Sequence, residues 1–72
     1  MRLIEKETLT KAANLKGYSV ANLAAAVDLS PGHLYAILRG ENTQPKTAKK
    51  IAKAVGIPLT DLFDVEERKE QP

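Results

Sequence analysis

The side chains that could carry out chemistry are few, and their spacing does not suit catalysis. His33 is the only histidine, cysteine is absent, and the two serines, Ser19 and Ser30, stand where helices would begin. A metal ion or an activated nucleophile needs several such groups converging on one pocket. Five of the nine acidic residues instead follow residue 60. We therefore expect no enzyme activity, no bound metal and no cofactor.

Positive charge is the remaining feature of the sequence that could support binding of a partner. Residues 1–56 carry nine lysines and arginines against four acids, a net charge of +5, whereas residues 57–72 carry a net charge of −3. A basic body permits a polyanionic partner such as nucleic acid. Many ordinary domains are equally basic, so this charge alone does not decide the function.

The length of 72 residues is enough for one domain. We place it at residues 1–64 and expect a charged, frayed tail at residues 65–72. No apolar run approaches the ~20 residues that span a bilayer, and acids interrupt the N-terminal segment where a signal peptide would be apolar. With no cysteine for a disulfide, we expect a cytoplasmic protein without a membrane partner.

Apolar side chains recur every three or four residues along most of the chain, which predicts helices and no strand. The first helix ends at Lys16-Gly17, and Ser19 can cap the second through its hydroxyl. The third spans about residues 30–39, and Gly40 suits the left-handed position that follows a helix.

Two further helices follow the loop that starts at residue 40. Pro45 suits the first position of the fourth helix, which ends at Gly56. Pro58 ends the next connection, and Thr60 is expected to cap a short fifth helix. The pattern therefore predicts a compact all-α fold of five helices.

The segment VDLSPG predicts a sharp corner between the second and third helices. Asp28 tolerates a left-handed backbone better than most residues other than glycine. Ser30 can cap the third helix, and Pro31 fits its first turn, where no backbone N–H is missed. Ala24 is small enough to let the two helix axes approach closely. Such a corner forms a helix-turn-helix, whose second helix can enter a DNA major groove about 12 Å wide.

The motifs SVANLAAAVDLSPGHLYAILRG and PKTAKKIAKAVGIPLTDLF resemble the lambda-repressor-like helix-turn-helix domains of Cro/cI type, also called the Xre family. The resemblance covers about residues 9 to 63. It implies a five-helix DNA-binding domain with the helix-turn-helix at the second and third helices. It also implies a sequence-specific transcriptional regulator, with repression the favoured role. Such a protein would bind double-stranded DNA as a homodimer on a palindromic operator.

The outer face of the third helix carries the residues that we expect to read bases. We expect Leu34, Ile37 and Leu38 to face the core, which leaves four positions for base edges: Gly32, His33, Tyr35 and Ala36. Gly32 is open to a second interpretation, as a glycine tolerated in a first turn. His33 could instead be a solvated surface residue, and Tyr35 could be a residue at the rim that packs on the second helix.

A second set of polar residues is expected to contact phosphates because it lies at helix ends and in the following loop, where the resembling family grips the DNA backbone. Its members are Ser19, Arg39, Asn42, Thr43 and Lys46. Lys46 stands in the first turn of a helix, where backbone N–H groups and the helix dipole favour an anion. We expect Lys49, Lys50 and Lys53 mostly to face solvent.

The fifth helix offers one candidate for the dimer interface. Leu59, Leu62 and Phe63 crowd a short segment and could pair two copies of the chain, with the N-terminal arm as a second contributor. The alternative is that these three side chains complete the core of the monomer.

A second function remains open because the third helix carries few polar side chains. The same fold could serve as a protein-interaction module, for example an antitoxin, whose partner the sequence does not identify. Steep salt dependence of DNA binding would favour the DNA-binding function.

Overall fold

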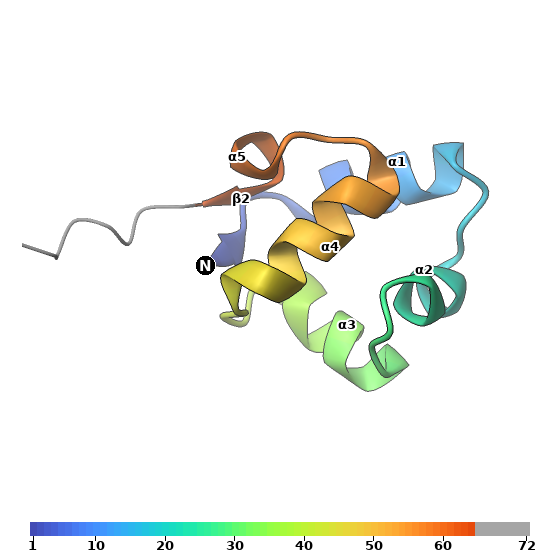
Figure 1. Cartoon of the computed structure of the whole chain (residues 1–72), viewed down its shortest axis with the longest axis horizontal. Helices are drawn as coiled ribbons and strands as arrows, with labels where there is room; N and C mark the ends of the chain where they lie inside the picture. Colours follow the sequence, from blue (N-terminus) through green and yellow to red (C-terminus); the bar gives the residue numbers. More distant parts are fainter. Residues whose placement is uncertain (65–72) are drawn as a thin grey trace, which may run out of the picture.

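The structure is a computed structural model that describes residues 1–64. These residues form five helices and two short strands (Figure 1). In chain order the elements are β1 (Arg2–Leu3), α1 (Lys6–Leu15), α2 (Val20–Ala26), α3 (Pro31–Leu38), α4 (Pro45–Val55), α5 (Leu59–Leu62) and β2 (Phe63–Asp64). The predicted helical fold is confirmed. The predicted tail at residues 65–72 lies outside the described residues.

The expectation of no strand is wrong in one detail. β1 and β2 pair antiparallel, with Arg2 opposite Asp64 and Leu3 opposite Phe63. Two residues per strand are too few to leave a readable alternation of apolar and polar side chains. Leu3 and Phe63 are both buried, so the pairing fastens the two ends of the described chain to the core.

The start of the fifth helix also differs from the prediction. α5 begins at Leu59 with Pro58 as its N-cap, and Thr60 lies inside the helix without capping it. Pro58 has a φ of −57° and a ψ of 142°, and its carbonyl accepts a hydrogen bond from the Asp61 N–H at 3.0 Å. The proline therefore ends the connection and leads directly into the helical turn.

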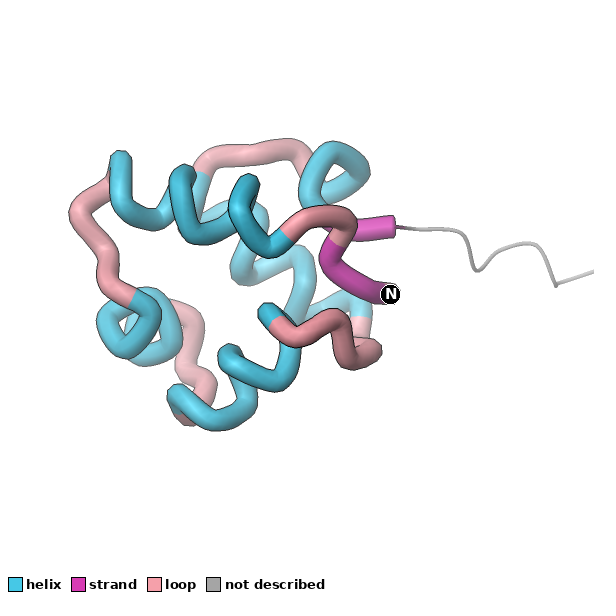
Figure 2. Tube along the Cα trace, turned by 180° about the vertical axis from the view of Figure 1, so that it is seen from behind, coloured by secondary structure: helices cyan, strands magenta, loops and turns pink. Residues whose placement is uncertain are grey.

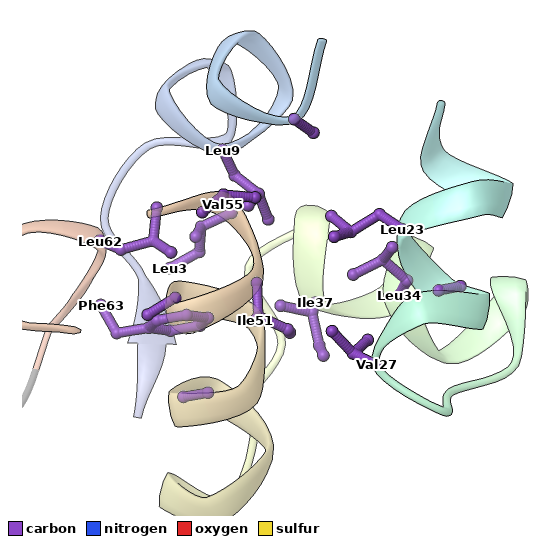
Figure 3. Packing of buried hydrophobic residues seen from close by; sticks show 14 residues of the cluster. Leu3, Leu9, Leu23, Val27, Leu34, Ile37, Ile51, Val55, Leu62 and Phe63 are labelled. Atoms are coloured by element: carbon purple, nitrogen blue, oxygen red, sulfur yellow. The ribbon is translucent and has the colours of Figure 1, made fainter. Parts of the chain in front are cut away.

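One hydrophobic core unites the elements (Figure 3). Every described helix contributes at least one side chain that is almost fully buried, and β2 adds Phe63. The largest from the helices are Leu9, Leu23, Leu34, Ile37, Ile51 and Leu62. Leu62 and Phe63 are 0% exposed, and Leu59 is half-buried against the same cluster. Leu62 and Phe63 therefore complete the monomer core, as the alternative held, and cannot pair two copies of the chain. A dimer interface at Leu59 stays a prediction. None of the described helices has the length and apolar character that a membrane crossing requires.

Candidate nucleic-acid interface

The corner between α2 and α3 is fixed by backbone hydrogen bonds. The Leu29 N–H donates to the Ala24 carbonyl at 2.8 Å, and the Asp28 N–H donates to the Ala25 carbonyl at 3.2 Å. This pair of bonds defines a Schellman motif, whose central residue takes a left-handed backbone. Asp28 occupies that position with a φ of 62°, as predicted, and is the one described residue other than glycine with a positive φ. Ala24 is fully buried beside the corner.

Both ends of α3 are closed by capping contacts. The Ser30 hydroxyl accepts from the His33 N–H at 3.1 Å, and Pro31 fills the first helical position, as predicted. At the other end the Glu41 N–H donates to the Ala36 carbonyl at 3.1 Å around Gly40, whose φ is 96°. Eight residues between two caps form a short, well-defined helix. It lies at the lower edge of the molecule in Figure 1, with its outer side turned away from the other helices.

The outer face of α3 has a centre and two flanks. Leu34 and Ile37 are buried, so a helix with 3.6 residues per turn places Gly32 and Ala36 near the middle of the opposite side. His33 and Tyr35 are two positions apart, about 200° around the helix, and therefore lie on different flanks. The four predicted base-reading residues thus lie at the centre and on the two flanks of the outer face.

The His33 flank meets the start of α4. His33, Asn42 and Thr43 line a shallow hollow together with two residues that the sequence analysis did not select, Gln44 and Thr47. Gln44 is the N-cap of α4, and Thr47 is in its first turn. Their position around Pro45 marks them in the sequence as residues at a helix start. Their proximity to His33, however, depends on how α3 packs on α4.

The Tyr35 flank meets α1. Tyr35, Leu38 and Arg39 line a second hollow together with Val20 of α2 and with Lys6, Glu7 and Thr10 of α1. Tyr35 is 52% exposed, so much of its ring remains available to a partner. Lys6 is a cation beside the site that the sequence analysis did not select, because α1 is far from α3 in the chain.

The predicted phosphate contacts after α3 are already engaged in contacts within the protein. Arg39 Nη2 donates to Glu41 Oε2 at 3.0 Å, and both side chains are exposed. Asn42 Oδ1 accepts from the Met1 amino group at 2.7 Å. Thr43 is only 9% exposed, and its backbone N–H and carbonyl both bond to Met1. Thr43 therefore offers little side-chain surface to a ligand.

The two predicted contacts at helix starts are exposed. The Ser19 hydroxyl accepts from the Asn22 N–H at 3.1 Å and donates to Asn22 Oδ1 at 2.9 Å, which confirms its capping role. Lys46 lies in the first turn of α4, where the N-cap side chain makes no capping hydrogen bond. The helix dipole and the free first-turn N–H groups add to the positive charge of Lys46.

A family model for helix-turn-helix domains matches residues 9–62 of the chain. The chain belongs to the helix-turn-helix family of Cro/cI type. The match includes α2, the corner and all of α3, so the family assignment and the geometry of the corner concern the same residues.

The chain is also similar to the HTH-type transcriptional regulator SlrR of Bacillus subtilis (strain 168). The two are 40% identical over 53 residues, which cover 71% of this chain and 35% of the relative. The matched part thus spans about a third of the relative's length. No solved structure matches the chain significantly.

Proposed function

We propose that the protein is a sequence-specific DNA-binding regulator of transcription that inserts α3 into the major groove. The family assignment and the similarity to a transcriptional regulator support DNA-binding regulation. The observation that carries the proposal is the outer face of α3: the helix has a cap at each end, and Gly32, His33 and Tyr35 on this face are exposed.

Gly32 gives this proposal its most specific support. A Cβ added there would meet no other part of the protein within 4 Å, and the residue does not take a positive φ. Neither packing nor backbone conformation therefore requires glycine, although glycine inside a helix costs up to about 1 kcal/mol relative to alanine. A missing side chain at the centre of the exposed face would let the α3 backbone come close to base edges.

The remaining residues divide into readers and backbone contacts. His33, Tyr35 and Ala36 would contact base edges, which differ between sequences in the major groove. Ser19, Arg39, Asn42 and Lys46 would contact phosphates, which position the protein without reading sequence. Thr43 was also expected to contact phosphate. Because its side chain is buried, we assign it instead to holding the loop after α3 in place.

Binding as a homodimer to a palindromic operator is the finer part of the proposal. A single module of this size buries too little surface to bind tightly alone, and two copies on a two-fold operator double the contact. We further propose that the protein acts as a repressor, since a protein seated on a promoter excludes the polymerase.

The alternative function is a protein-interaction module of antitoxin type. It draws support from the centre of the α3 face, where Gly32 and Ala36 provide no polar group to read a base. Under this alternative the exposed Tyr35 would belong to a protein contact.

Selection of bound sequences from a random DNA pool separates the two functions. The DNA-binding proposal expects an enriched inverted repeat and binding that weakens steeply with salt, by about 0.9 in log–log slope for each phosphate contact. A pool without enrichment, together with shallow salt dependence, would favour the protein-interaction module.

A further inference from the structure

Two of the three large apolar side chains that are exposed in the described part of the chain lie at the ends of α1. Leu15, the last residue of the helix, is 85% exposed, and Ile4, two residues before its start, is 54% exposed. The proposed function uses neither of them. α5, in contrast, keeps Leu62 fully buried in the monomer core and Leu59 half-buried against it.

We propose that the outer face of α1 binds the same face of a second copy of the chain, with the two helices antiparallel across a two-fold axis. In this arrangement the start of each helix lies beside the end of the other. Ile4 of each copy then lies near Leu15 of the second copy. Each exposed apolar side chain is covered by one from the other copy.

The charges on this face favour the antiparallel arrangement and a second copy as the occupant. Glu7 and Lys11 are both exposed, one helical turn apart, on the side of α1 opposite the buried Leu9 and Ala13. Antiparallel pairing places Glu7 of each copy beside Lys11 of the other, and the two-fold axis makes this contact twice. Parallel pairing would place like charges together.

One register satisfies both sets of contacts. One alignment of the two helices places residue 7 opposite residue 11, and another places residue 4 opposite residue 15. The two alignments differ by a shift of one residue, about 1.5 Å along the helix axis. Side chains as long as those of glutamate and lysine accommodate a difference of this size.

The size of the face predicts a weak contact. α1 has ten residues and is therefore about 15 Å long, whereas a stable interface buries about 800 Å² on each partner. One face of so short a helix supplies only part of that area. The contact would act mainly between copies that DNA holds at high effective concentration, and to this extent it rests on the proposed function.

The position of α1 is compatible with two copies on one DNA molecule. Figure 2 shows α1, the helix that follows β1, on the near side of the molecule, while α3 lies at the lower edge. A half-turn about the vertical axis of that view reverses the direction of α1 and keeps α3 at the lower edge. Both copies would therefore present α3 toward the same duplex.

Charge reversal tests the contact on DNA. The measurement is the cooperativity of binding to a fragment with two half-sites, relative to one half-site. Glu7→Lys or Lys11→Glu alone turns both ion pairs into like-charge pairs, and we expect about a tenfold loss of cooperativity. The double variant restores both pairs and should return to within about twofold of wild type. Lys53→Glu, the same charge change on α4, should retain wild-type cooperativity.

Cross-linking tests the register without DNA, so it stands even if the protein fails to bind any half-site. The chain has no cysteine, which makes the background clean. Equal parts of the Ile4→Cys and Leu15→Cys variants, mixed at high concentration and oxidised, should form the mixed covalent dimer faster than either variant forms its own. A mixture of Lys53→Cys with Leu15→Cys serves as the control. A mixed dimer no faster than that control, or unchanged cooperativity in both charge reversals, would overturn the proposal.

Discussion

At the residue scale, folding stability and DNA binding favour different residues around α3. Gly32 lowers helix stability without any packing reason, which is expected where binding rather than folding selects the residue. Glu41 pairs with Arg39 and so reduces the positive charge at the end of the proposed DNA-reading helix. Each of these residues gives a prediction about DNA binding.

Replacing Gly32 with alanine should stabilise the fold and weaken DNA binding. The alanine adds helix propensity worth up to about 1 kcal/mol, while its methyl group keeps α3 from the base edges. We expect a higher melting temperature and an operator affinity lower by at least about tenfold, the value of one base contact. Thermal melts and operator titration measure the two effects. Unchanged affinity in a stabilised variant would show that the DNA does not approach Gly32.

Replacing Glu41 with glutamine should strengthen binding to all DNA. The change releases Arg39 from an exposed ion pair worth at most about 1 kcal/mol and removes a negative charge near the phosphates. We expect affinity to rise about two- to fivefold for operator and random DNA alike, with a steeper salt dependence. Asp61→Asn, the same charge change on α5, serves as the control. An equal rise in that control would assign the effect to net charge alone.

At the element scale, the corner between α2 and α3 sets the direction in which α3 points. Two backbone hydrogen bonds close it around Asp28, in the conformation that Gly40 takes at the end of α3. A left-handed backbone costs a residue with a Cβ about 1–2 kcal/mol, and somewhat less for aspartate. The corner is therefore a strained position that the surrounding contacts hold in place.

Replacing Asp28 with glycine should stabilise the domain by about 0.5–1 kcal/mol, because the left-handed strain exceeds the added entropy of the unfolded chain. This corresponds to a melting temperature higher by about 2–8 °C. Asp28→Asn tolerates the same backbone and controls for charge, whereas Asp28→Ala should lower the melting temperature. A glycine variant that melts below wild type would mean that the aspartate side chain itself stabilises the corner.

The sequence predicts those elements whose limits depend on local chemistry. Ser19, Ser30 and Gly40 act within one turn of the chain, and the structure confirms each of them. The β1–β2 pair and the burial of Leu62 and Phe63 depend on how distant segments of the chain pack. Local sequence patterns do not show such packing. The hollow shared by His33 and Thr47 was missed for the same reason, because it forms where α3 crosses the start of α4.

At the scale of the whole molecule, one small core holds every element that positions α3 (Figure 3). Leu34 and Ile51 are 0% exposed, so neither can be shortened without leaving a cavity. Leu34→Ala or Ile51→Ala should cost about 2–5 kcal/mol, comparable with the total of about 3–5 kcal/mol that a core of this size supplies. We expect both variants to be largely unfolded at 37 °C by circular dichroism. Leu15→Ala, at an exposed site, should melt like wild type. Core variants with unchanged melting would show that these side chains do not support the fold.

The most direct test of the central claim compares affinity for the selected operator with affinity for random DNA. Wild type, His33→Ala, Tyr35→Ala and Lys46→Ala are titrated against both DNAs at one salt concentration. The claim that α3 reads bases predicts that the two α3 variants lower the ratio of the two affinities, by about 1–3 kcal/mol for each good base contact. Lys46→Ala should lower both affinities by similar factors, because phosphates carry no sequence information. An unchanged ratio in both α3 variants, with a changed ratio in Lys46→Ala, would contradict the claim.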